Sequence, residues 1–86
     1  MTSEEFKERF QHHPLGYVFQ IMEIATDELQ LERYASMAQG MIMLLEFQGK
    51  LSKEDHDFLK EAAKGNAKRN YDRLEKTNAP APTTKQ

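Results

Sequence analysis

Three histidines and fourteen acidic residues are the side chains of this 86-residue chain that could bind a metal ion or move a proton. His12 and His13 are adjacent, so on a helix their side chains would point about 100° apart and could not share an ion. Asp55, His56 and Asp57 are also consecutive, whereas a metal site on a helix needs ligands three or four residues apart. We therefore expect structural or exposed roles for these residues, with no bound metal or cofactor.

Acid–base catalysis would require a carboxylate made unusual by burial or by a charged neighbour. Glu23 and Glu46 are the acids that lie within dense apolar sequence, but each can project from the polar edge of a helix. The chain has no recognisable nucleophile motif and no glycine-rich phosphate loop. The sequence predicts that the protein is not an enzyme and takes no small-molecule substrate.

Positive charge is concentrated in the last third of the chain. Residues 1–57 carry 5 Lys or Arg against 11 Asp or Glu, whereas residues 58–86 carry 7 against 3. Lys60, Lys64 and Lys68 repeat along one face of a helix there. Arg69 and Arg73 belong to a second row, and these cations could contact phosphates. Acidic residues are interleaved with these cations at spacings typical of ordinary surface ion pairs. A solvated face is the favoured interpretation, and nucleic-acid binding is the alternative.

The elements that would position these residues are helices, because apolar residues recur at spacings of three and four. Thr2 and Glu5 have the form of a capping box, Pro14 suits a first helical turn, Gly49 suits a left-handed helix end, and Ser52 suits an N-cap. We predict an all-α bundle of three to four helices, at about 3–12, 14–25, 27–48 and 53–76. A single continuous helix over 14–48 remains an alternative to the second and third.

Composition sets the remaining expectations. The absence of cysteine excludes disulfides and fits a cytoplasmic protein. The longest apolar run, 41–45, is far shorter than the roughly 20 residues of a membrane span. The residues 1–76 are expected to form one helical domain. Residues 77–86, with two prolines and no large apolar side chain, predict a flexible tail.

The predicted helix at 27–48 has more apolar residues than one core stripe requires. Leu31, Ala38 and Leu45 belong to that stripe, whereas Leu29 and Met43 lie on or near a second flank. The candidate partner-binding residues are Ile21, Met37, Gly40, Leu44 and Phe47. Either other helices of the chain cover this flank, or another molecule does.

A small non-enzymatic interaction module is the predicted function. It would act as an adaptor, regulator or inhibitor that docks through an apolar patch of the second and third helices, on another protein or on a second copy of itself. The small size, acidic bias and lack of catalytic motifs are also typical of accessory proteins of phages and mobile elements.

Overall fold

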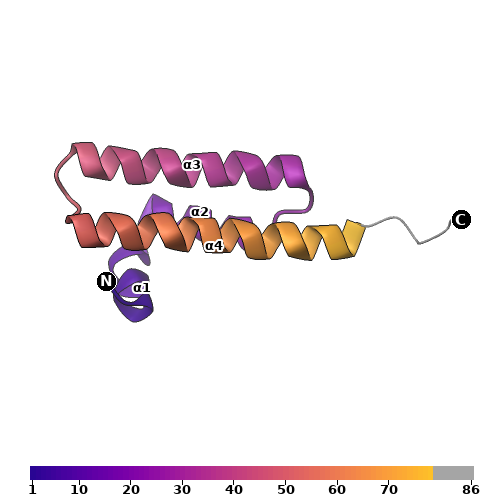
Figure 1. Ribbon diagram of the computed structural model, residues 1–86, viewed down its shortest axis with the longest axis horizontal. Coiled ribbons are helices and arrows are strands. Elements are labelled where there is room, and N and C mark those ends of the chain that lie inside the picture. The colour runs from indigo at the N-terminus through magenta and orange to yellow at the C-terminus, as the bar shows by residue number, and fades with distance from the viewer. Residues whose placement is uncertain (79–86) are drawn as a thin grey trace, which may run out of the picture.

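The computed structural model describes residues 1–78, which form four helices and no strand. Figure 1 shows the two longest helices lying antiparallel, with the second helix beside them and the first helix crossing at one end. The helices are α1 (Ser3–Phe10), α2 (Pro14–Glu23), α3 (Glu28–Phe47) and α4 (Lys53–Asn78). The predicted all-α class is confirmed.

The capping residues fix where the helices begin. Thr2 forms the expected capping box with Glu5, whose backbone N donates to Thr2 Oγ1 at 3.1 Å. At the start of α3 the cap is Asp27, whose Oδ1 accepts from the backbone N of Gln30 at 2.8 Å. Ser52 caps α4 in the same way. The short polar side chains predicted to begin helices therefore do so.

The helix ends differ from the expected bounds by a few residues. The predicted first helix, 3–12, stops at Phe10, because the segment before Pro14 turns back and His13 caps α2 through its Nδ1. The predicted fourth helix, 53–76, continues to Asn78. The predicted tail, 77–86, thus begins within α4, and residues 79–86 lie outside the described residues.

Helices α2 and α3 are separate, so the alternative of one continuous helix over 14–48 is wrong. Residues 24–27 link them, with Ile24 in a non-helical conformation and Asp27 already serving as the next cap. At the other end of α3, Gly49 adopts a φ of 69°. Its backbone N donates to the Glu46 carbonyl, and the next N donates to Leu45, both at 3.0 Å. This is a Schellman motif, as the glycine predicted.

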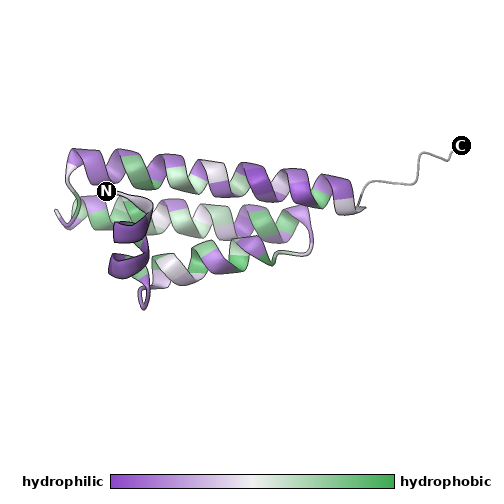
Figure 2. Cartoon of the chain, turned by 90° about the horizontal axis from the view of Figure 1, so that it is seen from below, coloured by the Kyte–Doolittle hydropathy of each residue, from purple (hydrophilic) through white to green (hydrophobic). Residues whose placement is uncertain are grey.

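The core lies between α2, α3 and α4. Its fully buried large side chains are Leu15, Val18, Met22, Leu31, Leu59 and Leu74. Figure 2 shows hydrophobic residues concentrated in α2 and α3, whereas α1 and α4 are mainly hydrophilic. The core stripe predicted for α3 is confirmed, since Leu31, Ala38, Ile42 and Leu45 are buried.

Helix α1 packs on α2 and on the start of α4, on the side of the bundle away from α3 (Figures 1 and 2). The Phe6 ring contacts the rings of Phe19 and Phe58, with centroids 5.0 and 6.4 Å away. Arg9 reaches Asp55 at 2.8 Å. Gly16 permits the close crossing, because a Cβ there would clash with the Phe10 carbonyl oxygen.

Candidate functional site

A row of exposed apolar side chains runs along the outer face of α3, and we call it the α3 flank. Phe47 is 84% exposed, and the other four large side chains are between 46% and 58% exposed. Helical spacing places these residues on one face, together with Gly40. The α3 flank consists of Leu29, Met37, Gly40, Met43, Leu44 and Phe47. Four of the five predicted partner-binding residues therefore lie together.

No helix among residues 1–78 covers the α3 flank. The short first helix was one candidate cover, but it packs against α2 and makes its contacts on the opposite side of the bundle. Helices α2 and α4 bury the inner stripe of α3, which contains Leu31 and Ile42, and leave the outer face to solvent. The sequence left this point open, because helical periodicity alone does not show which neighbour lies where.

The fifth predicted partner-binding residue, Ile21, belongs to α2 and is half-buried. Its neighbours Tyr17 and Ile24 are far more exposed, at 62% and 73%. Helical spacing puts Tyr17 and Ile21 on one side of α2, apart from the side that faces α4, and Ile24 follows in the non-helical cap. Tyr17 and Ile24 are thus better candidates for contact with a partner than Ile21.

Gly40 lies at the middle of the α3 flank. A Cβ built on it would meet no heavy atom of the described residues within 4 Å. A glycine inside a helix costs about 1 kcal/mol relative to alanine. Packing within the described part of the chain therefore gives no reason for a glycine here.

The predicted phosphate-contact residues do not form one free basic face. Arg69 pairs with Glu23 at 3.2 Å. Arg73 donates from Nε to Asn70 Oδ1 at 2.9 Å and from Nη2 to the Met22 carbonyl at 3.4 Å. Arg73 thereby helps to hold α4 against α2, whereas Arg69 makes a surface ion pair with α2.

The three lysines of that face are exposed. Lys64 lies 3.6 Å from Glu61, an ordinary pair within one turn. Lys60 and Lys68 have no ion-pair partner among residues 1–78. The basic surface available to a phosphate therefore reduces to the row Lys60, Lys64 and Lys68.

Two buried asparagines of α4, at 4% and 2% exposure, form a polar network with α2 that the sequence did not predict. Asn66 Nδ2 donates to the Phe19 carbonyl at 3.2 Å. Asn70 Nδ2 donates to Asn66 Oδ1 at 2.6 Å and to Glu23 Oε1 at 3.1 Å. Their position within the apolar stripe of α4 was the available signal, because buried amides in a core require partners.

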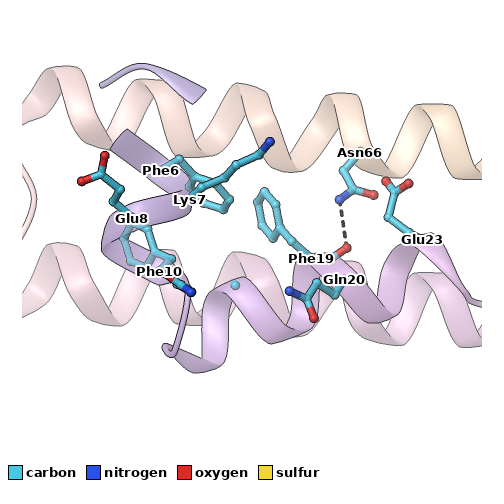
Figure 3. A pocket seen from close by; sticks show the side chains of 10 residues that line it. Phe6, Lys7, Glu8, Phe10, Phe19, Gln20, Glu23 and Asn66 are labelled. Carbon is cyan, nitrogen blue, oxygen red and sulfur yellow. Dashed lines mark hydrogen bonds between the residues drawn. The ribbon is translucent and has the colours of Figure 1, made fainter. Parts of the chain in front are cut away.

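A hollow of about 580 Å³ lies beside this network, between α1, α2 and α4 (Figure 3). Phe6, Phe10 and Phe19 supply its apolar wall. Its two carboxylates are Glu8 and Glu23, and the second already accepts from Arg69 and Asn70. The hollow is widely open, and we assign no ligand to it.

Two ionisable groups have clearly shifted pKa values. A hydrogen bond from Arg9 lowers the pKa of the Asp55 carboxyl, with help from the charges of Arg9 and of the N-terminal amine. Burial raises the pKa of the Tyr71 hydroxyl, and the nearby Glu32 carboxylate raises it further. Both shifts move away from neutral pH, so neither group becomes a general acid or base there.

Among the described residues no three His, Asp or Glu side chains converge on a point where a metal ion could bind. His56, predicted to have a structural or exposed role, is half-buried and lies 3.5 Å from Glu46 across the α3–α4 groove. No described helix is both long enough and apolar enough to cross a membrane.

Comparison with known proteins adds no assignment. No protein-family model, curated protein or solved structure matches the chain. The case for the α3 flank as an interaction site therefore depends on the exposure and arrangement of its residues.

Proposed function

We propose that this protein is a small, non-enzymatic interaction module that docks on a partner protein through the α3 flank. The observation that carries this proposal is the row of five exposed large apolar side chains along one face of α3. Isolated exposed apolar residues are normal on protein surfaces, whereas a contiguous row is typical of an interaction site.

The energetics of association favour the same surface. Full burial of a Leu, Met or Phe side chain stabilises a complex by about 1.5–3 kcal/mol. Most binding energy in protein interfaces comes from a few such anchors. Phe47 and Leu44 are the expected anchors, since both project from the last turns of α3 and are mostly exposed. Tyr17 and Ile24, in and just after α2, are further exposed apolar side chains.

A photo-crosslinking experiment tests the proposal in cells. Benzoylphenylalanine placed at position 47 of the full chain should form a covalent adduct with a protein on irradiation. The control is the same group at position 75, on the exposed side of α4. An adduct specific to position 47 supports the proposal. Absence of any adduct at position 47, or equal adducts at both positions, contradicts it.

Nucleic-acid binding through α4 is the second candidate, because Lys60 and Lys68 are exposed and have no ion-pair partner within residues 1–78. If all three lysines of the row contacted phosphates, the logarithm of the binding constant would fall with the logarithm of the salt concentration with a slope of about −2.7. A gel-shift series with duplex DNA measures that slope. Absence of a shift at low salt, or a shift unaffected by changing the three lysines to glutamate, excludes this candidate.

A further inference from the structure

Gly40 lies midway between two methionines of the α3 flank, whereas Leu44 is opposite Ser36, and Leu29 has no counterpart within α3. Met37 and Met43 lie three residues before and after it, and Leu44 lies four residues after it. Arg33 and Phe47 lie seven residues on either side. A pattern of this kind suits a helix that pairs with a reversed copy of itself, because residues equally distant from the crossing point then lie level.

We infer that the partner at the α3 flank is a second copy of this chain, with the two α3 helices antiparallel and crossing at Gly40. This inference rests on the proposed function above and specifies its partner. The interface is isologous, so that each contact occurs twice around a two-fold axis. Near the axis, Met37 of one copy packs against Leu44 of the other, which is almost level with it and on the same side of the crossing.

Gly40 acquires a role in this arrangement. Nothing in the described chain lies within 4 Å of a Cβ at this position, so a larger residue would fit the isolated molecule. At the crossing point of two helices, a residue without a side chain allows the backbones to approach closely. The helical stability lost at Gly40 is offset by contact with the second α3.

Charge complementarity supports the antiparallel direction. Arg33 is the one charged residue that helical spacing places within the α3 flank's face, and among residues 1–78 it has no ion-pair partner. In the antiparallel pair it lies level with Phe47 of the second copy. There it meets an aromatic ring and the negative end of a helix whose last turn has no basic residue. A parallel pair would instead bring the two Arg33 side chains together.

The size of the surface determines how strong the dimer can be. In the antiparallel pair the two α3 helices overlap from Arg33 to Phe47, which is roughly 21 Å of helix at 1.5 Å per residue, and Leu29 lies beyond the overlap. Two single-helix faces of this length give an interface at the lower end of the range for specific complexes. We therefore expect a reversible dimer with a dissociation constant on the order of micromolar, rather than an obligate one.

Sedimentation velocity of the purified full chain over a concentration series tests for the dimer. We expect a monomer–dimer equilibrium. Phe47→Arg should raise the dissociation constant by at least about tenfold, because it removes the aromatic ring and places a second cation level with Arg33 of the other copy. The matched control Glu75→Gln, on exposed α4, should leave the dissociation constant unchanged. A chain that stays monomeric at millimolar concentration, or a dimer unaffected by Phe47→Arg, overturns the inference.

Disulfide formation between single-cysteine variants tests the direction, since the natural chain has no cysteine. Gly40→Cys should form a disulfide dimer under mild oxidation. Phe47→Cys should not, because the two positions are about 21 Å apart in the antiparallel pair. Chains with Met37→Cys and Leu44→Cys, which both retain Gly40, should crosslink with each other when mixed. Self-crosslinking of Phe47→Cys as efficient as that of Gly40→Cys, or failure of the mixed pair, contradicts the arrangement.

The cellular crosslinking experiment separates this inference from the proposed function. An adduct at position 47 with twice the 10.0 kDa mass of the chain is expected here. An adduct with a different protein would retain the proposed function and overturn the second-copy inference. The absence of an adduct would overturn both. Removal of residues 79–86 is expected to leave the dimer intact, and loss of the dimer on their removal would contradict pairing through α3 alone.

Discussion

Asn70 shows how one residue can break the hydrophobic pattern of a helix and still stabilise the fold. It is 2% exposed, donates to Asn66 and Glu23, and accepts from Arg73 Nε at 2.9 Å. Buried polar groups cost little when they are fully hydrogen-bonded and a great deal when one partner is removed. The network therefore joins α4 to α2 as long as each member is present.

Asn70→Ala is expected to lower the free energy of unfolding by about 2 kcal/mol, because it leaves Arg73 Nε and Asn66 Oδ1 without their partner. Urea denaturation followed by circular dichroism measures the change. Lys68→Ala, on an exposed position of the same helix, is the control and should change stability by less than about 0.5 kcal/mol. Equal effects of the two substitutions would show that the network adds nothing to stability.

The ionised carboxylate of Asp55 makes the stability of the fold depend on pH in the acidic range. The hydrogen bond from Arg9 lowers the pKa of Asp55 in the folded state, so the ionised carboxylate stabilises the fold. That contribution is fully present above the unfolded-state value of about 3.9 and is lost as the pH falls through the lower folded-state pKa.

Asp55→Asn should accordingly destabilise the protein at pH 7 and have a smaller effect at pH 3. At pH 3 the carboxyl of the unfolded chain is mostly protonated, so part of the contribution of the folded-state carboxylate is already lost. Urea denaturation at the two pH values measures both differences. Glu54→Gln, an exposed neighbour in the same helical turn, is the control. If Asp55→Asn lowers the free energy of unfolding as much at pH 3 as at pH 7, this ion pair does not have the proposed role.

At the scale of elements, two helical glycines have opposite surroundings. Gly16 of α2 touches the end of α1, where a Cβ would overlap the Phe10 carbonyl. Gly40 of α3 faces open space in the isolated molecule. Replacement of either glycine by alanine would favour the helix itself, so an opposite effect of the two replacements on stability would come from packing.

Gly16→Ala should destabilise the protein, because α1 must shift away from α2 to make room for the methyl group. Gly40→Ala should stabilise the monomer by up to about 1 kcal/mol. Urea denaturation at a protein concentration well below the dissociation constant of the dimer, where the monomer dominates, gives both values. Destabilisation of the monomer by Gly40→Ala would show that Gly40 has a contact within the chain and would remove one support for the α3 dimer.

At the scale of the whole molecule, packing decides which face of α3 meets solvent. Leu44 and Leu45 are adjacent and chemically identical, yet Leu44 is 56% exposed and Leu45 is 9% exposed. Leu45 belongs to the core between α2, α3 and α4, whereas Leu44 belongs to the α3 flank. Neighbouring residues of a helix point about 100° apart, so one rotation of α3 fixes both environments.

Leu44→Glu is expected to leave helicity and thermal stability nearly unchanged, while Leu45→Glu should unfold the protein by placing a charge in the core. Circular dichroism during heating distinguishes the two. Similar loss of structure in both variants would mean that the α3 flank is buried, and it would contradict the exposed surface on which the proposed function depends.

Local sequence was sufficient to predict the helices and most of their boundaries. Backbone groups at the helix ends form hydrogen bonds with partners a few residues away, at the caps Thr2 and Ser52 and around Gly49. Such local contacts do not depend on the rest of the fold. The apolar stripe of α3 likewise identified the core residues Leu31 and Ala38. The sequence by itself therefore determined the all-α class, the core side of each long helix and the excess of apolar residues on α3.

Only the tertiary structure decided whether another helix covers the additional apolar residues of α3. The side of the bundle on which α1 packs depends on contacts between residues far apart in sequence, such as Arg9 with Asp55 and Phe6 with Phe58. The same kind of contact ties Arg69 to Glu23 and thereby reduces the predicted basic face. Periodicity describes one helix at a time, whereas exposure depends on the positions of all of them. For that reason the sequence predicted extra apolar residues on one side of α3, and only the packing of the four helices showed that these residues are exposed to solvent.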